Sequence, residues 1–223
     1  MKKPSIIQYL LSTCLFTIDE LTELYGSVPE DKRRVVADKK FNERDIEVRL
    51  GYPFRHMVHY EIQNNTGKKN GIKINHDLYV ESKDFEIEIK YLRRFESERG
   101  TPSNRQPWDP VKQDFDWIVE EIKRGNKGKR AFVMGWFNCG DSFANVIQLG
   151  ASKGTNPKVN ADRLVYFPFL NKTADGVRIN DLSYNYTNAY EALPINLENE
   201  MQEKFECMFL GNETDVFHFA IYY

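Results

Sequence analysis

The sequence has few cysteines and no close pair of them. Three cysteines, Cys14, Cys139 and Cys207, are spread over 223 residues. An odd number without a CxxC pair argues against a disulfide framework and against a structural zinc site, and it indicates a reducing compartment. The sequence also lacks a long apolar run, so it predicts no membrane span and no membrane partner. We therefore expect a cytoplasmic protein.

The N-terminus combines a basic start with an apolar run. Residues 11–14, Leu-Ser-Thr-Cys, loosely match a lipoprotein cleavage box. The apolar run is short, however, and Gln8 and Tyr9 interrupt it. Apolar residues also continue beyond Cys14, so a secretion signal is the less favoured interpretation.

A strong charge imbalance is missing as well. The chain has 31 Lys and Arg against 33 Asp and Glu, a net charge of -2 at pH 7. A general nucleic-acid binder would show a global basic field, so any contact with a polyanion must come from local basic patches. With 41% hydrophobic residues, the length predicts a single domain with a sizeable core.

Helical periodicity dominates the first part of the chain, residues 1–40. We predict one helix beginning at Pro4 and a second one opened by a Thr17-x-x-Glu20 capping box and ended by Gly26. A charged linker is expected from Pro29 to about Lys40. The core, residues 41–137, then begins with a helix capped by Asn42 and closed by Gly51.

Strand patterns follow that helix. Strands are predicted at Phe54–Gln63, after which comes a polar turn at Asn64–Gly71, and on both sides of a loop at residues 81–84. A helix opened by Asp109-Pro110 and ended by Gly125, and a buried strand at Ala131–Phe137, complete the core. This order indicates an α/β protein with a mixed sheet, in which a meander is followed by a right-handed crossover.

The C-terminal extension, residues 138–223, is patterned less clearly. Arg163 to Leu170 and Val216 to Tyr222 are predicted as strands, and Asn196 to Phe209 as a helix. This part is expected to extend the sheet and to supply substrate contacts or a dimer surface.

The hairpin predicted over residues 72–91 would bring two carboxylates and a lysine together. If Val80 lies opposite Phe85, then Asp77 lies opposite Glu88 on the solvated face of the ribbon, and Lys90 is one pleat away. In the same register His76 falls on the apolar face, as a core histidine. Opposed carboxylates destabilise a hairpin unless a cation lies between them.

Asp77, Glu88 and Lys90, spaced Asp-x10-Glu-x-Lys, resemble the active-site motif of the PD-(D/E)xK nuclease superfamily. The element order over residues 41–137 also resembles that restriction-endonuclease-like core, α-β-β-β-α-β. The resemblance implies a Mg²⁺-dependent nuclease acting on nucleic acid, with DNA favoured, in which Asp77 and Glu88 hold the metal. Mn²⁺ can substitute in such sites. Lys90 would position or activate the attacking water.

The family often adds an acid from the first core helix, and the resemblance implies Glu47 or Glu43 for it. A polar residue on the helix after the motif would be Gln113. His76 departs from the family, which usually has proline before the aspartate. The chemistry is consistent with the residues, because Mg²⁺ prefers oxygen ligands and keeps several waters.

Two alternatives stay open. Glu-x-Lys also occurs at Glu30, Glu81 and Glu121, so the string alone is weak, and the acids could belong to a solvated sheet edge. The protein could be a binding or inhibitor protein that retains the fold, or a defence effector nuclease gated by a partner or ligand. The expected phosphate contacts are Lys68, Lys69, Arg93, Arg94, Arg99 and Arg105, with the Lys123 to Arg130 cluster as a further candidate. A homodimer is one way to cut both strands.

Overall fold

A seven-stranded mixed sheet runs through the centre of the protein in the order β1-β2-β3-β4-β7-β6-β5. This computed structural model describes residues 5–69, 72–92, 108–138, 144–147, 158–171, 182–195, 197 and 205–223. The strands are β1 Val58–Lys69, β2 Ile72–Val80, β3 Phe85–Leu92, β4 Arg130–Phe137, β5 Ala192–Ile195, β6 Phe205–Leu210 and β7 Phe217–Tyr222. β3 and β4 pair in parallel, and the other described pairs are antiparallel.

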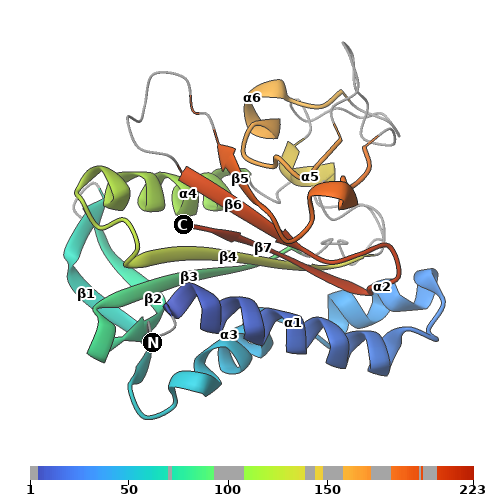
Figure 1. The fold of residues 1–223 in the computed structure, drawn as a ribbon, viewed down its shortest axis with the longest axis horizontal. Coiled ribbons are helices and arrows are strands. Elements are labelled where there is room, and N and C mark those ends of the chain that lie inside the picture. Colours follow the sequence, from blue (N-terminus) through green and yellow to red (C-terminus); the bar gives the residue numbers. More distant parts are fainter. Residues whose placement is uncertain are drawn as a thin grey trace.

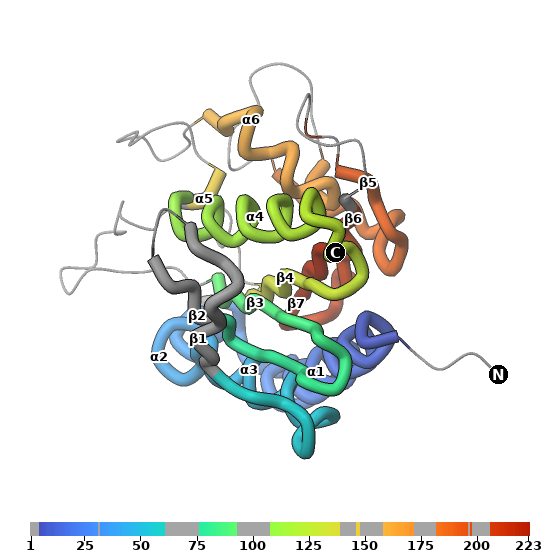
Figure 2. Tube along the Cα trace, turned by 90° about the vertical axis from the view of Figure 1, so that its left-hand side faces the viewer, coloured from blue at the N-terminus to red at the C-terminus, as the bar shows by residue number. Residues whose placement is uncertain are grey.

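Helices cover both faces of this sheet (Figures 1 and 2). One face carries α1 Ile6–Tyr25, α2 Glu30–Lys39 and α3 Glu43–Gly51. The other carries α4 Trp108–Lys123, α5 Ala144–Ile147 and α6 Ala161–Leu164. Short 3-10 turns are η1 Tyr52–Phe54, η2 Glu81–Lys83 and η5 Tyr186–Asn188. The α/β class and the mixed sheet predicted from the sequence are confirmed.

Two hydrophobic cores follow from this layering. Alternate residues of the central strand β4 divide between them: Val133 packs with Leu10 and Ile46 in the core of α1–α3. Phe132 packs with Phe115 in the core of α4. Because β4 is buried on both faces, its sequence is a nearly continuous apolar run.

The central elements lie where the sequence predicts them. α3, β1, β2, β3, α4 and β4 follow one another in the expected order. The N–H of Asn42 donates to the side chain of Asp45 at the start of α3 (2.8 Å). β1 begins later than expected because Pro53 lies in a 3-10 turn. It also extends to Lys69, so most of the predicted polar turn is strand, with a register shift between Asn64 and Lys68.

The N-terminal prediction of two helices and a linker is wrong, although a helix does end at Gly26 as predicted. α1 is one continuous helix of 20 residues, with a capping box formed by Ser5 and Gln8. Thr17 opens no second helix, because its hydroxyl donates to the carbonyl of Thr13 one turn back (2.9 Å). The predicted linker forms α2.

Two C-terminal predictions are also wrong, whereas β7 confirms the strand expected at Val216–Tyr222. Arg163–Leu170 is not a strand, since α6 ends at Leu164 and turns follow it. The helix predicted over Asn196–Phe209 is contradicted at residues 205–209, which lie in β6. Short apolar runs of this kind are ambiguous between helix and strand.

None of the described helices is long and apolar enough to cross a membrane. Cys14 and Cys207 are buried free thiols, and Cys139 lies outside the described residues.

Candidate active site

Strands β2 and β3 part on the N-terminal side of Leu78, and carboxylates fill the gap between them. The pairing begins as predicted, with Val80 opposite Phe85, and its last described pair is Leu78 with Ile87. The N–H of Glu86 donates to a carbonyl on the β4 side. Since successive N–H groups of a strand point to opposite edges, those of Ile89 and Tyr91 point toward β2.

Side chains accept these two N–H groups where β2 has departed. The N–H of Ile89 donates to Oδ2 of Asp77 (2.6 Å). The N–H of Tyr91 donates to Oε2 of Glu43 on α3 (2.8 Å). The fork between β2 and β3 therefore fixes two carboxylates through the main chain of β3.

Lys90 lies in the same fork and contacts both helix layers. Its Nζ is 3.3 Å from Oδ2 of Asp114 on α4 and 3.8 Å from Oε2 of Glu43 on α3. These two helices cover opposite faces of the sheet (Figure 2). The gap thus lets groups from both layers meet, and we call Asp77, Glu88, Glu43 and Asp114 the carboxylate cluster.

Glu88 and Asp77 lie against each other at the centre of the cluster. Their side chains share a hydrogen bond, and Glu88 is 7% exposed. Burial, followed by the charge of Asp114, raises the pKa of Glu88 well above its usual value. Burial, followed by the charge of Glu88, raises the pKa of Asp77 to about 8, although the N–H of Ile89 opposes this shift. Without a cation, the two carboxyls therefore retain a proton near neutral pH.

Lys90 has the opposite tendency. Burial lowers its pKa, but the charges of Asp114 and Glu43 outweigh burial and the net shift is upward. Lys90 is therefore an ammonium group at neutral pH, a hydrogen-bond donor and not a base.

The donor set fits a hard divalent cation with few protein ligands. Among the described residues, no three or more His, Cys, Asp or Glu side chains form a metal-binding group. Mg²⁺ commonly binds through one or two carboxylates and keeps several waters. Asp77 and Glu88, which are in contact and hold a proton that a cation could replace, could provide those two ligands.

His76 is placed differently from the prediction. It is buried and hydrogen-bonded, as expected, but it lies on the side of Glu86 and Glu88. Its Nδ1 is 2.8 Å from Oε1 of Glu88, and its ring lies against Trp117 of α4. The assignment to the apolar face assumed strict alternation along a regular ribbon, but the residues of β2 that precede Leu78 are not paired with β3. The face of β3 that carries Glu88 was expected to be solvated, but α4 covers it.

The three further predicted site residues, Glu43, Glu47 and Gln113, lie in different environments. Glu43 reaches Lys90, whereas Glu47 is buried and paired with Arg44 (2.5 Å). Gln113 is exposed on α4, and its neighbour Asp114, missed by the sequence reasoning, reaches Lys90. The missed signal was helical spacing, because Asp114 precedes the buried Trp117 by three positions.

The expected phosphate contacts lie mostly beyond what can be described. Arg93, Arg94, Arg99 and Arg105 are outside the described residues, and so are the side chains of Lys68 and Lys69. In the Lys123 to Arg130 cluster three basic residues pair with carboxylates: Arg124 with Glu120 and Glu121, Lys129 with Asp84, and Arg130 with Glu86 and Glu121.

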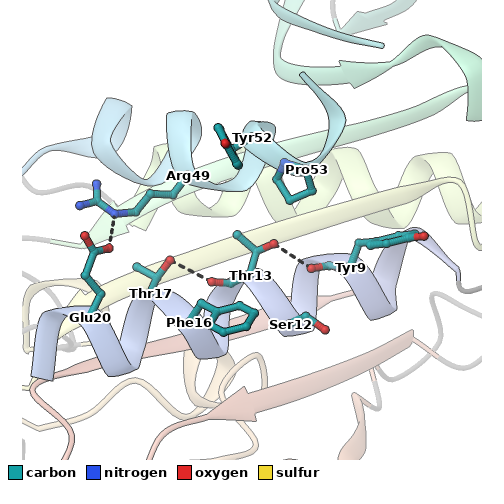
Figure 3. A pocket seen from close by; sticks show the side chains of 9 residues that line it. All are labelled: Tyr9, Ser12, Thr13, Phe16, Thr17, Glu20, Arg49, Tyr52 and Pro53. Carbon is teal, nitrogen blue, oxygen red and sulfur yellow. Dashed lines mark hydrogen bonds and ion pairs between the residues drawn. The ribbon is translucent and has the colours of Figure 1, made fainter. Parts of the chain in front are cut away.

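A separate pocket of about 540 Å³ lies between α1 and the α3–η1 segment (Figure 3). Its lining includes Phe16 and Tyr52 and is largely apolar. The ionisable pair in the lining, Glu20 and Arg49, is already joined by a hydrogen bond of 3.1 Å. None of its lining residues belongs to the carboxylate cluster, which therefore remains the candidate for chemistry.

Comparison with known proteins adds no assignment. The chain matches no family model, no curated protein and no solved structure.

Proposed function

We propose that the protein is a Mg²⁺-dependent nuclease that hydrolyses phosphodiester bonds of nucleic acid, with DNA the favoured substrate. The observation that carries this proposal is the fork between β2 and β3. It gathers Asp77, Glu88 and Lys90 in one place, with Glu43 and Asp114 beside them. The resemblance to the PD-(D/E)xK superfamily supports the same function.

In this proposal Asp77 and Glu88 are the metal ligands. Mg²⁺ bound there would stabilise charge on the scissile phosphate and activate a water. Asp77 is held by the main chain of Ile89, so its carboxylate needs little reorganisation to bind the metal. Because the protein ligands are two, several coordination positions would remain for water and for a phosphate oxygen.

Lys90 acts as a cation in this mechanism. Its raised pKa means that it cannot accept a proton from water near neutral pH. Its ammonium group instead donates hydrogen bonds to the attacking water or to a phosphate oxygen, where negative charge grows in the transition state. Glu43 and Asp114 hold it in place from two sides.

Cleavage assays with purified full-length protein test the proposal. Plasmid, linear duplex, single-stranded DNA and RNA would be incubated with Mg²⁺, Mn²⁺ or EDTA. We expect cleavage with either metal and none with EDTA. Asp77→Asn, Glu88→Gln and Lys90→Met should each lower the rate by about 100-fold or more.

A matched control is provided by Lys83→Met. Lys83 belongs to an identical Glu-x-Lys spacing, Glu81-Ser82-Lys83, but lies exposed in η2. Its substitution should leave cleavage unchanged. Activity that survives in both Asp77→Asn and Lys90→Met would place the active site elsewhere. Absence of cleavage by the wild type, restored by a cell extract, would favour the gated effector.

A further inference from the structure

We infer that His76 is a positioning residue that holds the Glu88 carboxylate in its metal-binding orientation, and that a buried ion-pair network around Arg130 supports it. The inference rests on the proposed function. It concerns a residue that does not itself touch the metal or the substrate.

The imidazole of His76 is held on three sides. It is 1% exposed. Its Nδ1 is hydrogen-bonded to Oε1 of Glu88 (2.8 Å), and its Nε2 is 3.3 Å from Oε2 of Glu86. The Trp117 ring lies 5.1 Å from the imidazole, centroid to centroid. Rotation of the imidazole would break both polar contacts, so its orientation is fixed.

The network around Arg130 is anchored to backbone carbonyl groups. Nε of Arg130 is 2.9 Å from Oε2 of Glu86 and 3.3 Å from Oε2 of Glu121. Nη1 of Arg130 also donates to the carbonyls of Asp84 and Lys129. Glu86, Glu121 and Arg130 are all buried. The cationic Arg130 lies between the buried carboxylates of Glu86 and Glu121, so the network is a rigid support for His76.

Glu88 needs such a support more than Asp77 does. A glutamate side chain has three rotatable bonds, and ordering it costs conformational entropy. Asp77 is oriented by the N–H of Ile89, and the corresponding contact for Glu88 is His76. Groups that orient metal ligands contribute to affinity, and their loss typically weakens binding by about 10–100-fold.

A matched pair of substitutions separates the two nitrogens of His76. The amide of His76→Asn can occupy the position of Nδ1 and hold Glu88, whereas that of His76→Gln extends to the position of Nε2 and holds Glu86. Mn²⁺ dissociation constants would be measured on the full chain by electron paramagnetic resonance. We expect His76→Gln to weaken binding by about 10–100-fold and His76→Asn to stay near the wild type. Metal-free thermal unfolding of both variants controls for stability.

Each outcome decides the question. Wild-type Mn²⁺ affinity in His76→Gln, or equal weakening in both variants, overturns the positioning role. If the wild type shows no Mn²⁺ binding that Asp77→Asn removes, the proposed function fails and this inference fails with it. Binding that is lost in His76→Gln and retained in His76→Asn supports both.

A measurement on the wild type covers the case in which a variant does not fold. The imidazole ¹⁵N resonances of His76 should shift when Mg²⁺ is added, because Nδ1 contacts Glu88. His218, whose ring is hydrogen-bonded to the carbonyl of Asn212 (3.1 Å), is the internal reference. Unchanged His76 resonances at saturating Mg²⁺ would overturn the inference.

Discussion

Two neighbouring carboxyls with raised pKa values distinguish the fork from the rest of the protein. A carboxylate at the protein surface is solvated and costs little free energy to ionise. Asp77 and Glu88 instead share a partly enclosed site. Ionising both costs free energy, because burial and mutual repulsion act in the same direction. Such pairs occur at functional sites more often than elsewhere.

The pKa of Asp77 predicts how stability depends on pH. Its ordinary pKa of 3.8 is raised to about 8 in the folded protein. Between these values the folded state binds more protons at this group than the unfolded state does, so the contribution of Asp77 to stability falls as pH rises from about 4 to 8. Glu88 acts in the same direction. The buried His76 and His218 have lowered pKa values and act in the opposite direction below about pH 6.5, so urea unfolding with EDTA should show the decline between pH 6.5 and 8, and Asp77→Asn should reduce it.

The control for this prediction is Asp109→Asn, which removes one negative charge at an exposed position of α4. Its pH profile should follow that of the wild type. An Asp77→Asn profile that declines between pH 6.5 and 8 as steeply as the wild type would contradict the shift. Saturating Mg²⁺ should also reduce the decline, since a cation favours the ionised carboxylates.

At the scale of the elements, the predictions succeeded where the local sequence pattern decides the structure. The hairpin of β2 and β3, the amphipathic helix α4 and the buried strand β4 lie where their patterns place them. They failed where tertiary contacts decided the outcome. Nothing local shows that Thr17 would bond back to Thr13 inside a longer helix, or that residues 205–209 would enter the sheet beside β7.

The candidate site was predictable only in the part that the hairpin pattern determines. Regular pairing suffices to bring Asp77 toward Glu88, and period two places Lys90 beside Glu88. The separation of β2 from β3 on the N-terminal side of Leu78 has no sequence signature that we recognise. It moves His76 to the side of Glu88 and makes room for Asp114, so these partners could not be derived from the hairpin pattern.

The position of α3 depends on a close contact with β4. A Cβ on Gly135 would lie 2.9 Å from Cδ1 of Ile46 and equally close to the Phe219 ring. Alanine would otherwise suit a strand better than glycine by about 0.5–1 kcal/mol. Overpacking costs about 1–3 kcal/mol, so Gly135→Ala should destabilise the protein. It should also reduce cleavage, because α3 carries Glu43.

A double-mutant cycle tests that contact. Ile46→Val removes the methyl group that the new Cβ would meet. Alone it should cost about 0.5–1.5 kcal/mol, but in the Gly135→Ala background it should cost less or stabilise the protein. Equal effects in both backgrounds, measured by urea unfolding, would show that Gly135 does not set the position of α3.

At the scale of the whole molecule, the carboxylate cluster costs folding stability that the rest of the fold must offset. The protein carries a net charge of -2, so under the proposed function its long-range attraction for nucleic acid would be weak and local contacts would have to dominate. The fold tolerates the repulsion between Asp77 and Glu88 because two cores on either side of the sheet hold β3 and β4. Destabilised active sites supported in this way are common in enzymes.

Two buried glutamates should therefore respond oppositely to the same substitution. Glu88→Gln keeps an amide beside His76 and removes repulsion, so at pH 8 without metal it should leave stability equal or higher. Glu121→Gln leaves the buried Arg130 with one carboxylate fewer and should destabilise the protein by about 3 kcal/mol. Glu121→Gln should retain stabilisation by Mg²⁺, about 1.4 kcal/mol at ten times the dissociation constant, and Glu88→Gln should lose it. Mg²⁺ stabilisation that persists in Glu88→Gln, measured by thermal unfolding, would mean that the cation binds outside the fork.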